Sequence, residues 1–249
     1  MIGPLETRLL ERRRRRGPLW AVLLDPDSLP PLELSRTACE VEGAGADLLL
    51  VGGSSASPGV FEAGMKAIRA ASTLPLVLFP GSYHQVVEGA DGILFTTLLS
   101  GRNPQYLAEE QVNGAPRVRR LGLESIPTAY LLIESGVPTT VQLVSGTLPL
   151  PRTAEDSVLH HVWAAACMGM RWAYLEAGSG AVDPVPVPLL RRVVEEGGVQ
   201  VIVGGGLRTP EAVAERALLH PTMVVTGNVL EAKRDPDFLR AMSQAVHQT

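Results

Sequence analysis

Eight short apolar runs, rich in Val, Leu and Ile, follow one another at fairly even spacing and alternate with helical patterns. Near-continuous apolar runs are typical of parallel strands that are covered on both faces of a sheet. Eight such units in 249 residues predict an α/β fold, a modified (β/α)8 TIM barrel that forms a single domain over residues 1–249. A doubly wound open sheet is the alternative. The runs occupy residues 19–24, 47–51, 76–79, 92–95, 128–133, 172–176, 199–203 and 222–226.

The pattern between the runs predicts helices, but its middle part is irregular. Residues 79–91 leave room only for a short turn or helical stub, so one covering helix is expected to be shortened or replaced. Residues 100–120 are expected to form a long polar loop, and residues 137–144 an extra strand. Five consecutive arginines, residues 12–16, are expected on a solvated amphipathic N-terminal helix rather than in a nucleic-acid site. The helical patterns cover residues 32–42, 59–71, 154–168, 187–196, 210–218 and 235–246.

Charge and cysteine content limit the classes of partner and compartment. The formal net charge of −4 gives no electrostatic reason to bind nucleic acid, and contact with a membrane is expected to be peripheral at most. No apolar stretch approaches the roughly 18 residues that a membrane-spanning helix needs. Cys39 and Cys167 lie in apolar helical patterns and are expected to be buried free thiols in a reducing compartment. We therefore expect a cytoplasmic protein.

Glycine-rich turns follow three successive strands in the second half of the chain. These turns are Ala177-Gly178-Ser179-Gly180, Gly204-Gly205-Gly206 and Gly227-Asn228. Glycine lets a backbone approach a ligand closely, and grouped backbone N–H donors bind anions. In barrel enzymes phosphate often lies between the loops after strands 7 and 8. The three turns therefore predict one phosphate site, although tight turns between strand and helix would also favour glycine.

Glu176 is the candidate catalytic base because it ends a strand, directly before the first glycine turn. A carboxylate there would face the barrel mouth beside bound phosphate, where it could accept a proton from a substrate hydroxyl. A structural salt bridge is the alternative. Tyr174 lies two residues earlier and therefore points the same way. Its hydroxyl would contact the substrate, or its ring would only fill the barrel.

A candidate metal site lies on another side of the barrel mouth. Asp25 ends the first predicted strand, and Ser54 follows the second in the turn Gly52-Gly53-Ser54. Because these strands are neighbours, the two side chains can converge, and oxygen ligands with free positions suit Mg²⁺. The string Asp25-Pro26-Asp27 alone is commonly only a turn. Together with the glycine turns, however, the pair predicts two phosphate subsites and two phosphorylated substrates.

Several motifs together resemble the geranylgeranylglyceryl phosphate synthase family, in the form of its second, larger-subunit group. The resemblance covers the chain from about residue 19 to the last helix. It rests on Leu24-Asp25-Pro26-Asp27, Val51-Gly52-Gly53-Ser54, Leu99-Ser100-Gly101-Arg102-Asn103-Pro104, Tyr174-Leu175-Glu176-Ala177-Gly178-Ser179-Gly180-Ala181, Val203-Gly204-Gly205-Gly206-Leu207-Arg208-Thr209-Pro210-Glu211 and Val225-Thr226-Gly227-Asn228.

The resemblance implies a Mg²⁺-dependent prenyltransferase that joins geranylgeranyl diphosphate to the 3-hydroxyl of sn-glycerol 1-phosphate and releases diphosphate. It assigns Mg²⁺ to Asp25 and Ser54, fits Glu176 and Tyr174 as catalytic residues, and implies a homo-oligomer, either a dimer or a hexamer. The prenyl tail would lie in an apolar groove beside the thin flank after Phe79. Glycerol phosphate would be bound by Tyr174, Leu175, Glu176, Ala177, Gly178, Ser179, Gly180, Gly205, Gly206, Gly227 and Asn228.

Two positions depart from the family pattern. Ser28 stands where many relatives have a lysine, and Leu23 stands where the first group of the family has a basic residue. Glycerol phosphate is therefore expected to depend more on backbone amides, and Arg208 is left without an assigned role. Two alternative functions stay open, a sugar-phosphate isomerase or lyase that uses Asp25 as acid–base, and a non-catalytic phosphate-binding barrel.

Overall fold

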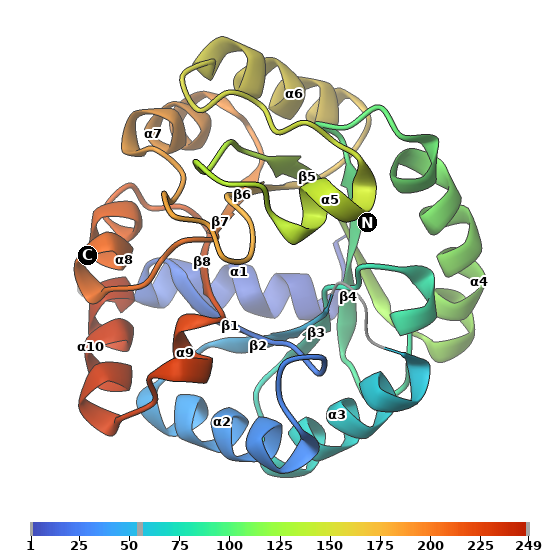
Figure 1. Cartoon of the computed structure of the whole chain (residues 1–249), viewed down its shortest axis with the longest axis vertical. Helices are drawn as coiled ribbons and strands as arrows, with labels where there is room; N and C mark the ends of the chain where they lie inside the picture. The colour runs from blue at the N-terminus through green and yellow to red at the C-terminus, as the bar shows by residue number, and fades with distance from the viewer. Residues whose placement is uncertain (1, 54–56, 248–249) are drawn as a thin grey trace.

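A computed structural model describes residues 2–53 and 57–247 as a closed barrel of eight parallel strands. The strands follow one another in sequence order around the barrel, and β1 closes it by pairing with β8 (Figure 1). All eight predicted strands are confirmed. They are β1 (Leu19–Leu24), β2 (Leu48–Val51), β3 (Leu76–Leu78), β4 (Gly92–Leu98), β5 (Glu124–Leu132), β6 (Trp172–Glu176), β7 (Gln200–Gly204) and β8 (Met223–Thr226).

Helices surround the barrel, and the one expected to be shortened is short. After β3 there is only a single 3₁₀ turn, η1 (Tyr83–Gln85), which confirms the modified barrel predicted from residues 79–91. No helix within the described ranges is long and apolar enough to cross a membrane. The covering helices are α2 (Pro31–Ala44), α3 (Pro58–Ala71), α4 (Glu110–Leu121), α6 (Glu155–Cys167), α7 (Val187–Glu196), α8 (Pro210–Ala217) and α10 (Pro236–His247).

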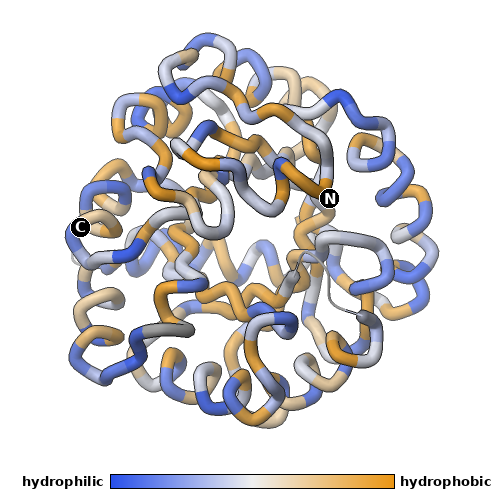
Figure 2. Tube along the Cα trace, viewed as in Figure 1, coloured by the Kyte–Doolittle hydropathy of each residue, from blue (hydrophilic) through white to orange (hydrophobic). Residues whose placement is uncertain are grey.

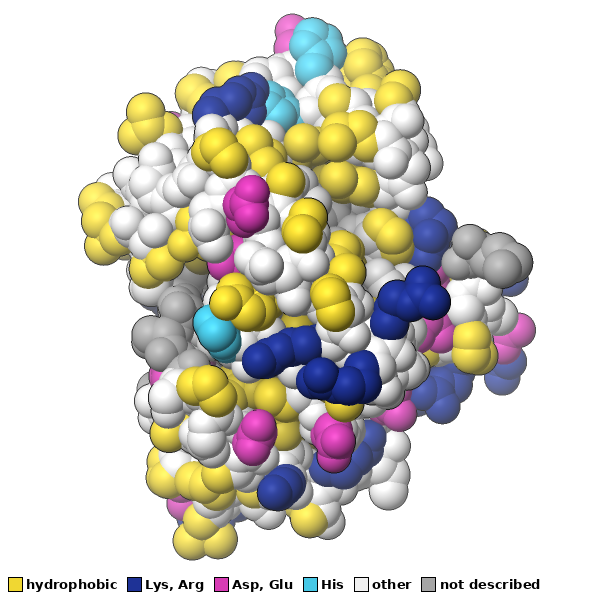
Figure 3. All heavy atoms as spheres, turned by 90° about the vertical axis from the view of Figure 1, so that its right-hand side faces the viewer, with side chains coloured by type: hydrophobic (Ala, Val, Ile, Leu, Met, Phe, Trp, Pro, Cys, Tyr) yellow, Lys and Arg dark blue, Asp and Glu magenta, His cyan; other side chains and the backbone are white. Residues whose placement is uncertain are grey.

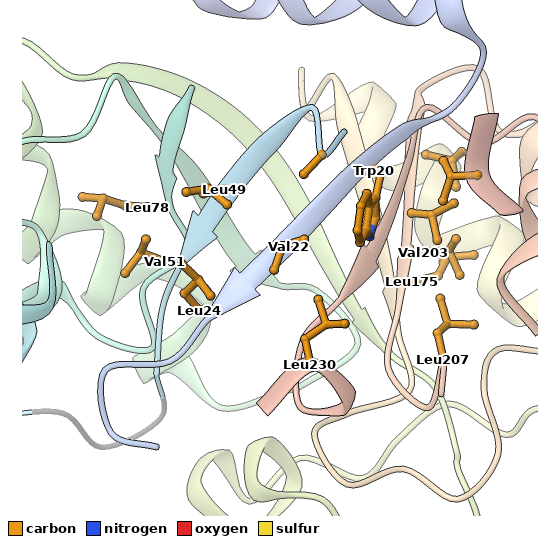
Figure 4. Close-up of a cluster of buried hydrophobic side chains, with 14 of the residues drawn as sticks. Trp20, Val22, Leu24, Leu49, Val51, Leu78, Leu175, Val203, Leu207 and Leu230 are labelled. Carbon is orange, nitrogen blue, oxygen red and sulfur yellow. The ribbon is translucent and has the colours of Figure 1, made fainter. Parts of the chain in front are cut away.

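The core consists of two apolar layers, because successive side chains of a strand point to opposite faces. The outer layer lies between strands and helices and includes Trp20, Leu175 and Val203 (Figure 4). The inner layer fills the barrel and includes Trp172 and Tyr174. Figure 2 shows the resulting pattern, with hydrophobic strands at the centre and hydrophilic residues along the outer helices. This alternation turns Tyr174 and Glu176 inward and Leu175 outward.

An N-terminal helix, α1 (Pro4–Arg16), crosses the barrel at the end opposite the strand C-termini (Figure 1). Leu5 and Leu9 are buried in the inner layer and close this end. Glu6, which is only 1% exposed, accepts hydrogen bonds from the Arg171 guanidinium and from Trp172 Nε1. The predicted amphipathic helix is confirmed, and its apolar face is part of the core.

Two arginines of the run 12–16 on α1 bind a buried carboxylate, Asp47, which directly precedes β2. Arg12 Nε lies 2.5 Å and Arg16 Nη1 2.9 Å from Asp47 Oδ1. The other oxygen accepts the Trp20 backbone N–H at 2.8 Å and lies 2.8 Å from His247 Nε2 on α10. Asp47 thereby joins the first and last helices of the chain to the bottom of the barrel.

The expectation of a long polar loop over residues 100–120 was wrong. A π-helical turn, η2 (Gln105–Glu109), leads into α4, which continues through Gly114 and Pro116. Gly114 and Pro116 suggested a loop, but burial of Val118 and a left-handed C-cap at Gly122 stabilise the helix. The side of the molecule that includes α4 mixes hydrophobic, basic and acidic side chains (Figure 3).

The expectation of an extra strand over residues 137–144 was also wrong. The segment contains a short helix, α5 (Thr140–Ser145). Thr139 Oγ1 accepts the Gln142 N–H at the start of this helix, and Gly146 ends it in the left-handed conformation. β-Branched residues gave the segment a strand-like pattern, and these two caps outweigh that preference.

The cysteines were expected to be buried, and this was wrong as well. Cys39 on α2 and Cys167 at the end of α6 are free thiols, and both are exposed. Each lies beside the apolar stripe of its helix rather than within it, since Ala38 and Ala165 are the buried neighbours.

Candidate active site

A cavity of about 450 Å³ opens at the C-terminal ends of the strands. Its wall includes residues from the predicted glycine turns, from the predicted metal site and from the flank beside η1. One continuous space therefore joins three chemically different regions that lie far apart in the sequence.

The three glycine turns meet on one side of this cavity. Residues Gly178, Ser179, Gly180, Gly205, Gly206, Gly227 and Asn228 all line it. Ser179 Oγ lies 3.1 Å from Asn228 Oδ1 and donates to it, which ties the turn after β6 to the turn after β8. Arg208 Nη2 donates to the Gly180 carbonyl at 3.2 Å and ties the turn after β6 to the turn after β7. The turns therefore form one connected rim.

Gly205 shows why the rim needs glycine. Its φ is +83°, a region that residues with a side chain rarely adopt. A Cβ at this position would lie 2.4 Å from Glu176 Oε1 and 2.6 Å from the Gly178 backbone nitrogen. The backbone of the β7 turn thus passes directly against the carboxylate that the sequence predicts as the base.

Glu176 is the last residue of β6 and is only 6% exposed. Its Oε1 accepts the Gly178 N–H at 2.6 Å, and its carboxylate is also hydrogen-bonded to the Tyr174 hydroxyl. Burial raises the pKa of the Glu176 carboxyl, and the bonds from Tyr174 and Gly178 counteract that effect only in part. A buried carboxylate with a raised pKa, fixed by two donors and facing a cavity, can accept a proton from a bound hydroxyl.

Three aromatic rings pack together at the floor of the cavity. Tyr174 stacks on Phe79 with ring centroids 5.2 Å apart and meets Tyr130 edge-on at 5.5 Å. Burial and the nearby Glu176 charge raise the pKa values of the Tyr130 and Tyr174 hydroxyls well above the usual range. Both tyrosines therefore stay protonated, so the floor of the cavity is aromatic and uncharged.

The sequence analysis did not identify Tyr130 and Phe79 as cavity residues. Tyr130 pairs in register with Tyr174 across β5 and β6, so both rings point into the barrel from neighbouring strands. In the sequence, Tyr130 could have been found as a tyrosine within the otherwise apolar run that forms β5. Once the barrel register is known, that tyrosine falls beside Tyr174.

The predicted metal side of the mouth contains two carboxylates that converge on one backbone position. Asp25 Oδ1 lies 2.5 Å, and Asp27 Oδ2 3.1 Å, from the point where a Cβ of Gly53 would be. Asp25 Oδ1 also accepts the Asp27 N–H at 2.8 Å. Burial is the largest influence on Asp25 and raises the pKa of its carboxyl. Ser54, the second predicted metal ligand, lies outside the described residues.

The cavity continues as an apolar arm on the flank where the covering helix is reduced to η1. Its wall there includes Ile93 and Phe95 from β4, Val144 from α5, and Phe79 and Val86, which directly follow β3 and η1. This is the flank where the sequence analysis expected an apolar groove.

Two of the predicted substrate-binding residues do not line the cavity. Leu175 (Figure 4) is fully buried in the outer apolar layer, and so is Ala177. The Ala177 N–H donates to the Gly204 carbonyl at 3.0 Å and so continues the pairing of β6 with β7. These two residues position the turn after β6 rather than contact the cavity.

Comparisons with known proteins agree on one family. The model of the PcrB family matches residues 10–246. The geranylgeranylglyceryl phosphate synthase of Korarchaeum cryptofilum is 42% identical over 228 residues, which cover 91% of this chain and 93% of that protein. The protein of the same name from Methanopyrus kandleri is also 42% identical, over 94% of this chain and 96% of its own.

A solved structure has the same fold over the full length. The (S)-3-O-geranylgeranylglyceryl phosphate synthase of Thermoplasma acidophilum, in complex with its substrate sn-glycerol-1-phosphate, aligns with a TM-score of 0.92. It is 35% identical, and the alignment covers 100% of both chains.

Proposed function

The chain belongs to the PcrB family, and from this premise we propose that it is a prenyltransferase of the geranylgeranylglyceryl phosphate synthase type. In this reaction the 3-hydroxyl oxygen of sn-glycerol 1-phosphate forms a bond to the allylic carbon of geranylgeranyl diphosphate. The bond from that carbon to the diphosphate oxygen breaks, and the hydroxyl proton is transferred to the enzyme. The observation that carries the proposal is that one cavity joins the glycine rim, the buried base and an apolar arm.

The glycine rim is the proposed binding site for the acceptor phosphate. The Ala177 and Gly178 N–H groups are already bonded to Gly204 and Glu176, so they are not offered to the ligand. We therefore assign the phosphate to the later part of this turn, Ser179 and Gly180, together with the turns after β7 and β8. Gly178 then has a different role, because its N–H orients the base.

Glu176 is the proposed general base. Its position directly before the rim places the carboxylate beside an acceptor whose phosphate lies on the glycine turns. The raised pKa makes Glu176 a stronger base than an exposed glutamate, and the Tyr174 hydroxyl holds it in place. This geometry favours a catalytic role for Glu176 over the structural salt bridge considered as an alternative, because no cation bonds to this carboxylate within the described residues.

The apolar arm is the proposed site for the prenyl tail of the donor. The aromatic floor of the cavity connects this arm to the base, because Phe79 is part of the arm wall and stacks on Tyr174, which is hydrogen-bonded to Glu176. Positive charge that develops on the allylic carbon is stabilised by the negative faces of such rings. The apolar arm favours this reading over a sugar-phosphate isomerase or lyase, whose substrate is polar throughout.

The carboxylates of Asp25 and Asp27 suit Mg²⁺. Such ions are commonly held by one or two carboxylates together with substrate phosphates, rather than by a full set of protein ligands. Within the described residues no group of three or more His, Cys, Asp or Glu side chains could form a complete metal site, which agrees with a shared site of that kind. We propose that Asp25 holds Mg²⁺ together with Asp27; Ser54, the other ligand expected from the sequence, lies outside the described residues. When bound, the ion neutralises charge on the leaving diphosphate.

The proposal is tested by incubating the protein with labelled sn-glycerol 1-phosphate, Mg²⁺ and prenyl diphosphates of graded length. We expect an ether product with the C20 donor and no product in the presence of a chelator. Absence of an ether product at every chain length would refute the prenyltransferase, and product formed equally well with chelator would refute the role of Asp25. Consumption of a sugar phosphate without any prenyl donor would instead support the isomerase or lyase.

Self-association as a dimer or hexamer stays a prediction. Leu143, Val144 and Leu148 are apolar and more than half exposed on and after α5, which is consistent with a protein contact. Light scattering after size-exclusion chromatography gives the mass in solution directly, and a monomer of 26.5 kDa would contradict the prediction.

A further inference from the structure

The described wall of the cavity contains four carboxylates but only one basic side chain. The carboxylates are Asp25, Asp27, Glu110 and Glu176, and the basic residue is Arg208. The proposed substrates are both anionic, so the acidic wall repels them unless positive charge or backbone donors compensate. Arg208 is therefore the one side chain in this wall that attracts a phosphate by its charge.

The backbone on both sides of Arg208 is fixed, while its guanidinium is nearly free. Leu207 is only 4% exposed and packs in the outer apolar layer. Thr209 is the N-cap of α8 and accepts the Ala212 N–H. Between these anchors the exposed Arg208 side chain has a single hydrogen bond to the described part of the chain, from Nη2 to the Gly180 carbonyl at 3.2 Å. A guanidinium has five N–H donors, so most of them can still bind a ligand.

The position of this hydrogen bond indicates which of the two substrate phosphates Arg208 would bind. Gly180 belongs to the glycine turn after β6, where the acceptor phosphate is proposed to bind. Asp25 follows β1, which lies two strands away from β7 around the barrel. An arginine held at the glycine turn is thus closer in the fold to the acceptor subsite than to the carboxylates assigned to the donor.

We propose that Arg208 is a clamp for the phosphate monoester of the acceptor and selects its dianion. This inference rests on the proposed function. On binding, the guanidinium keeps the turns after β6 and β7 together and donates to phosphate oxygens that the backbone amides leave unbound. Charge-assisted bonds of this type are about twice as strong as neutral ones, so the clamp adds affinity for a dianion that backbone amides alone do not supply.

The test compares Arg208→Gln and Arg208→Lys with the control Arg102→Gln. Arg102 is an exposed arginine after β4, on the same end of the barrel, and is not part of the cavity wall. We expect Arg208→Gln to raise KM for sn-glycerol 1-phosphate by about 10- to 100-fold, with kcat and KM for the prenyl diphosphate little changed. The lysine variant should recover part of the loss, and Arg102→Gln should behave as wild type.

The pH dependence separates a clamp from a structural bond between turns. The second pKa of a phosphate monoester is near 6, so the acceptor changes from dianion to monoanion below that pH. In the wild type, KM for sn-glycerol 1-phosphate should rise steeply below about pH 6, and in Arg208→Gln this rise should be much smaller. An unchanged pH profile in Arg208→Gln would refute the clamp, as would a rise in KM for the prenyl diphosphate alone.

Calorimetric titration with sn-glycerol 1-phosphate alone keeps this test separate from the proposed reaction. If wild type binds it and Arg208→Gln binds it at least tenfold more weakly, the clamp stands even when no ether product forms. If both bind it equally while product forms normally, the clamp is refuted and the proposed function is untouched.

Discussion

Replacing Gly205 by alanine is expected to damage catalysis through Glu176. The positive φ of +83° at this position alone makes a side chain cost about 1–2 kcal/mol of folding stability. Contact of the new Cβ with the Gly178 backbone nitrogen, at 2.6 Å, adds to that cost. The new Cβ would lie 2.4 Å from Glu176 Oε1, so the carboxylate must move by roughly 0.6 Å to reach even a tight contact. Misplacement of a catalytic group on this scale lowers turnover by up to about 100-fold. We therefore expect kcat of Gly205→Ala to fall by between about 10- and 100-fold.

Gly169→Ala is the matched control for this prediction. Gly169 has the same φ of +83° in the turn before β6, but a Cβ there meets no atom within 4 Å. Urea denaturation should show a loss of about 1–2 kcal/mol for Gly169→Ala and a larger loss for Gly205→Ala, whose Cβ also meets the Gly178 backbone nitrogen. Initial-rate measurements should show normal kcat for Gly169→Ala. Wild-type kcat in Gly205→Ala as well would refute the reasoning, because the clash with Glu176 would then have no catalytic effect.

Three further predictions concern carboxylates. Glu176→Gln keeps an acceptor for the Gly178 N–H but cannot take a proton, so kcat should fall by about 10²- to 10⁴-fold, with KM nearly unchanged in steady-state assays. Burial raises the pKa of Glu176 above its value in the unfolded chain. The contribution of this carboxyl to folding stability is therefore fully present below the pKa of the unfolded chain and is lost as pH rises through the pKa of the folded protein. Glu176→Gln should therefore gain thermal stability relative to wild type between pH 4 and pH 7, and a constant difference in melting temperature over that range would contradict this prediction. Asp47→Ala should cost about 1–3 kcal/mol in urea denaturation, because the buried Trp20 N–H loses its acceptor, whereas the partly exposed Arg12 and Arg16 can be hydrated.

The pH dependence of Asp47 has the opposite sign. Burial by itself raises the pKa of Asp47, but the bonds from His247 and the Trp20 N–H, with the positive charges nearby, lower it overall. This contribution to stability is present above the unfolded pKa of the carboxyl and is lost as pH falls through the lower folded value. Acid denaturation of wild type should therefore include a step that Asp47→Ala lacks.

The sequence predicted the barrel and much of the site because strand ends have a recognisable pattern. Apolar runs followed by glycine or aspartate located the ends of β1, β2, β6, β7 and β8, and strand alternation placed Tyr174 and Glu176 on the inner face. The family resemblance then pointed to the flank after Phe79. These inferences needed only the order of residues along single strands.

What the sequence did not predict depends on contacts between distant segments. Tyr130 became a cavity residue only through its register with Tyr174 on the next strand. The arginines of α1 indicated a solvated helix, whereas Asp47 and the bottom of the barrel bury part of it. The helix α4 was missed because local signals from Gly114 and Pro116 favour a loop, and tertiary packing of Val118 overrides them.

The cavity mouth is proposed to bind its two substrates at separate sites. The glycine rim binds the acceptor phosphate without metal, and the Asp25 side binds the donor diphosphate with Mg²⁺. Calorimetric titration of each ligand, with Mg²⁺ and with a chelator, tests this directly. We predict that sn-glycerol 1-phosphate binds with the same Kd in both conditions, while binding of the prenyl diphosphate weakens strongly when Mg²⁺ is removed. Loss of sn-glycerol 1-phosphate binding on chelation, or diphosphate binding that is indifferent to Mg²⁺, would contradict the account.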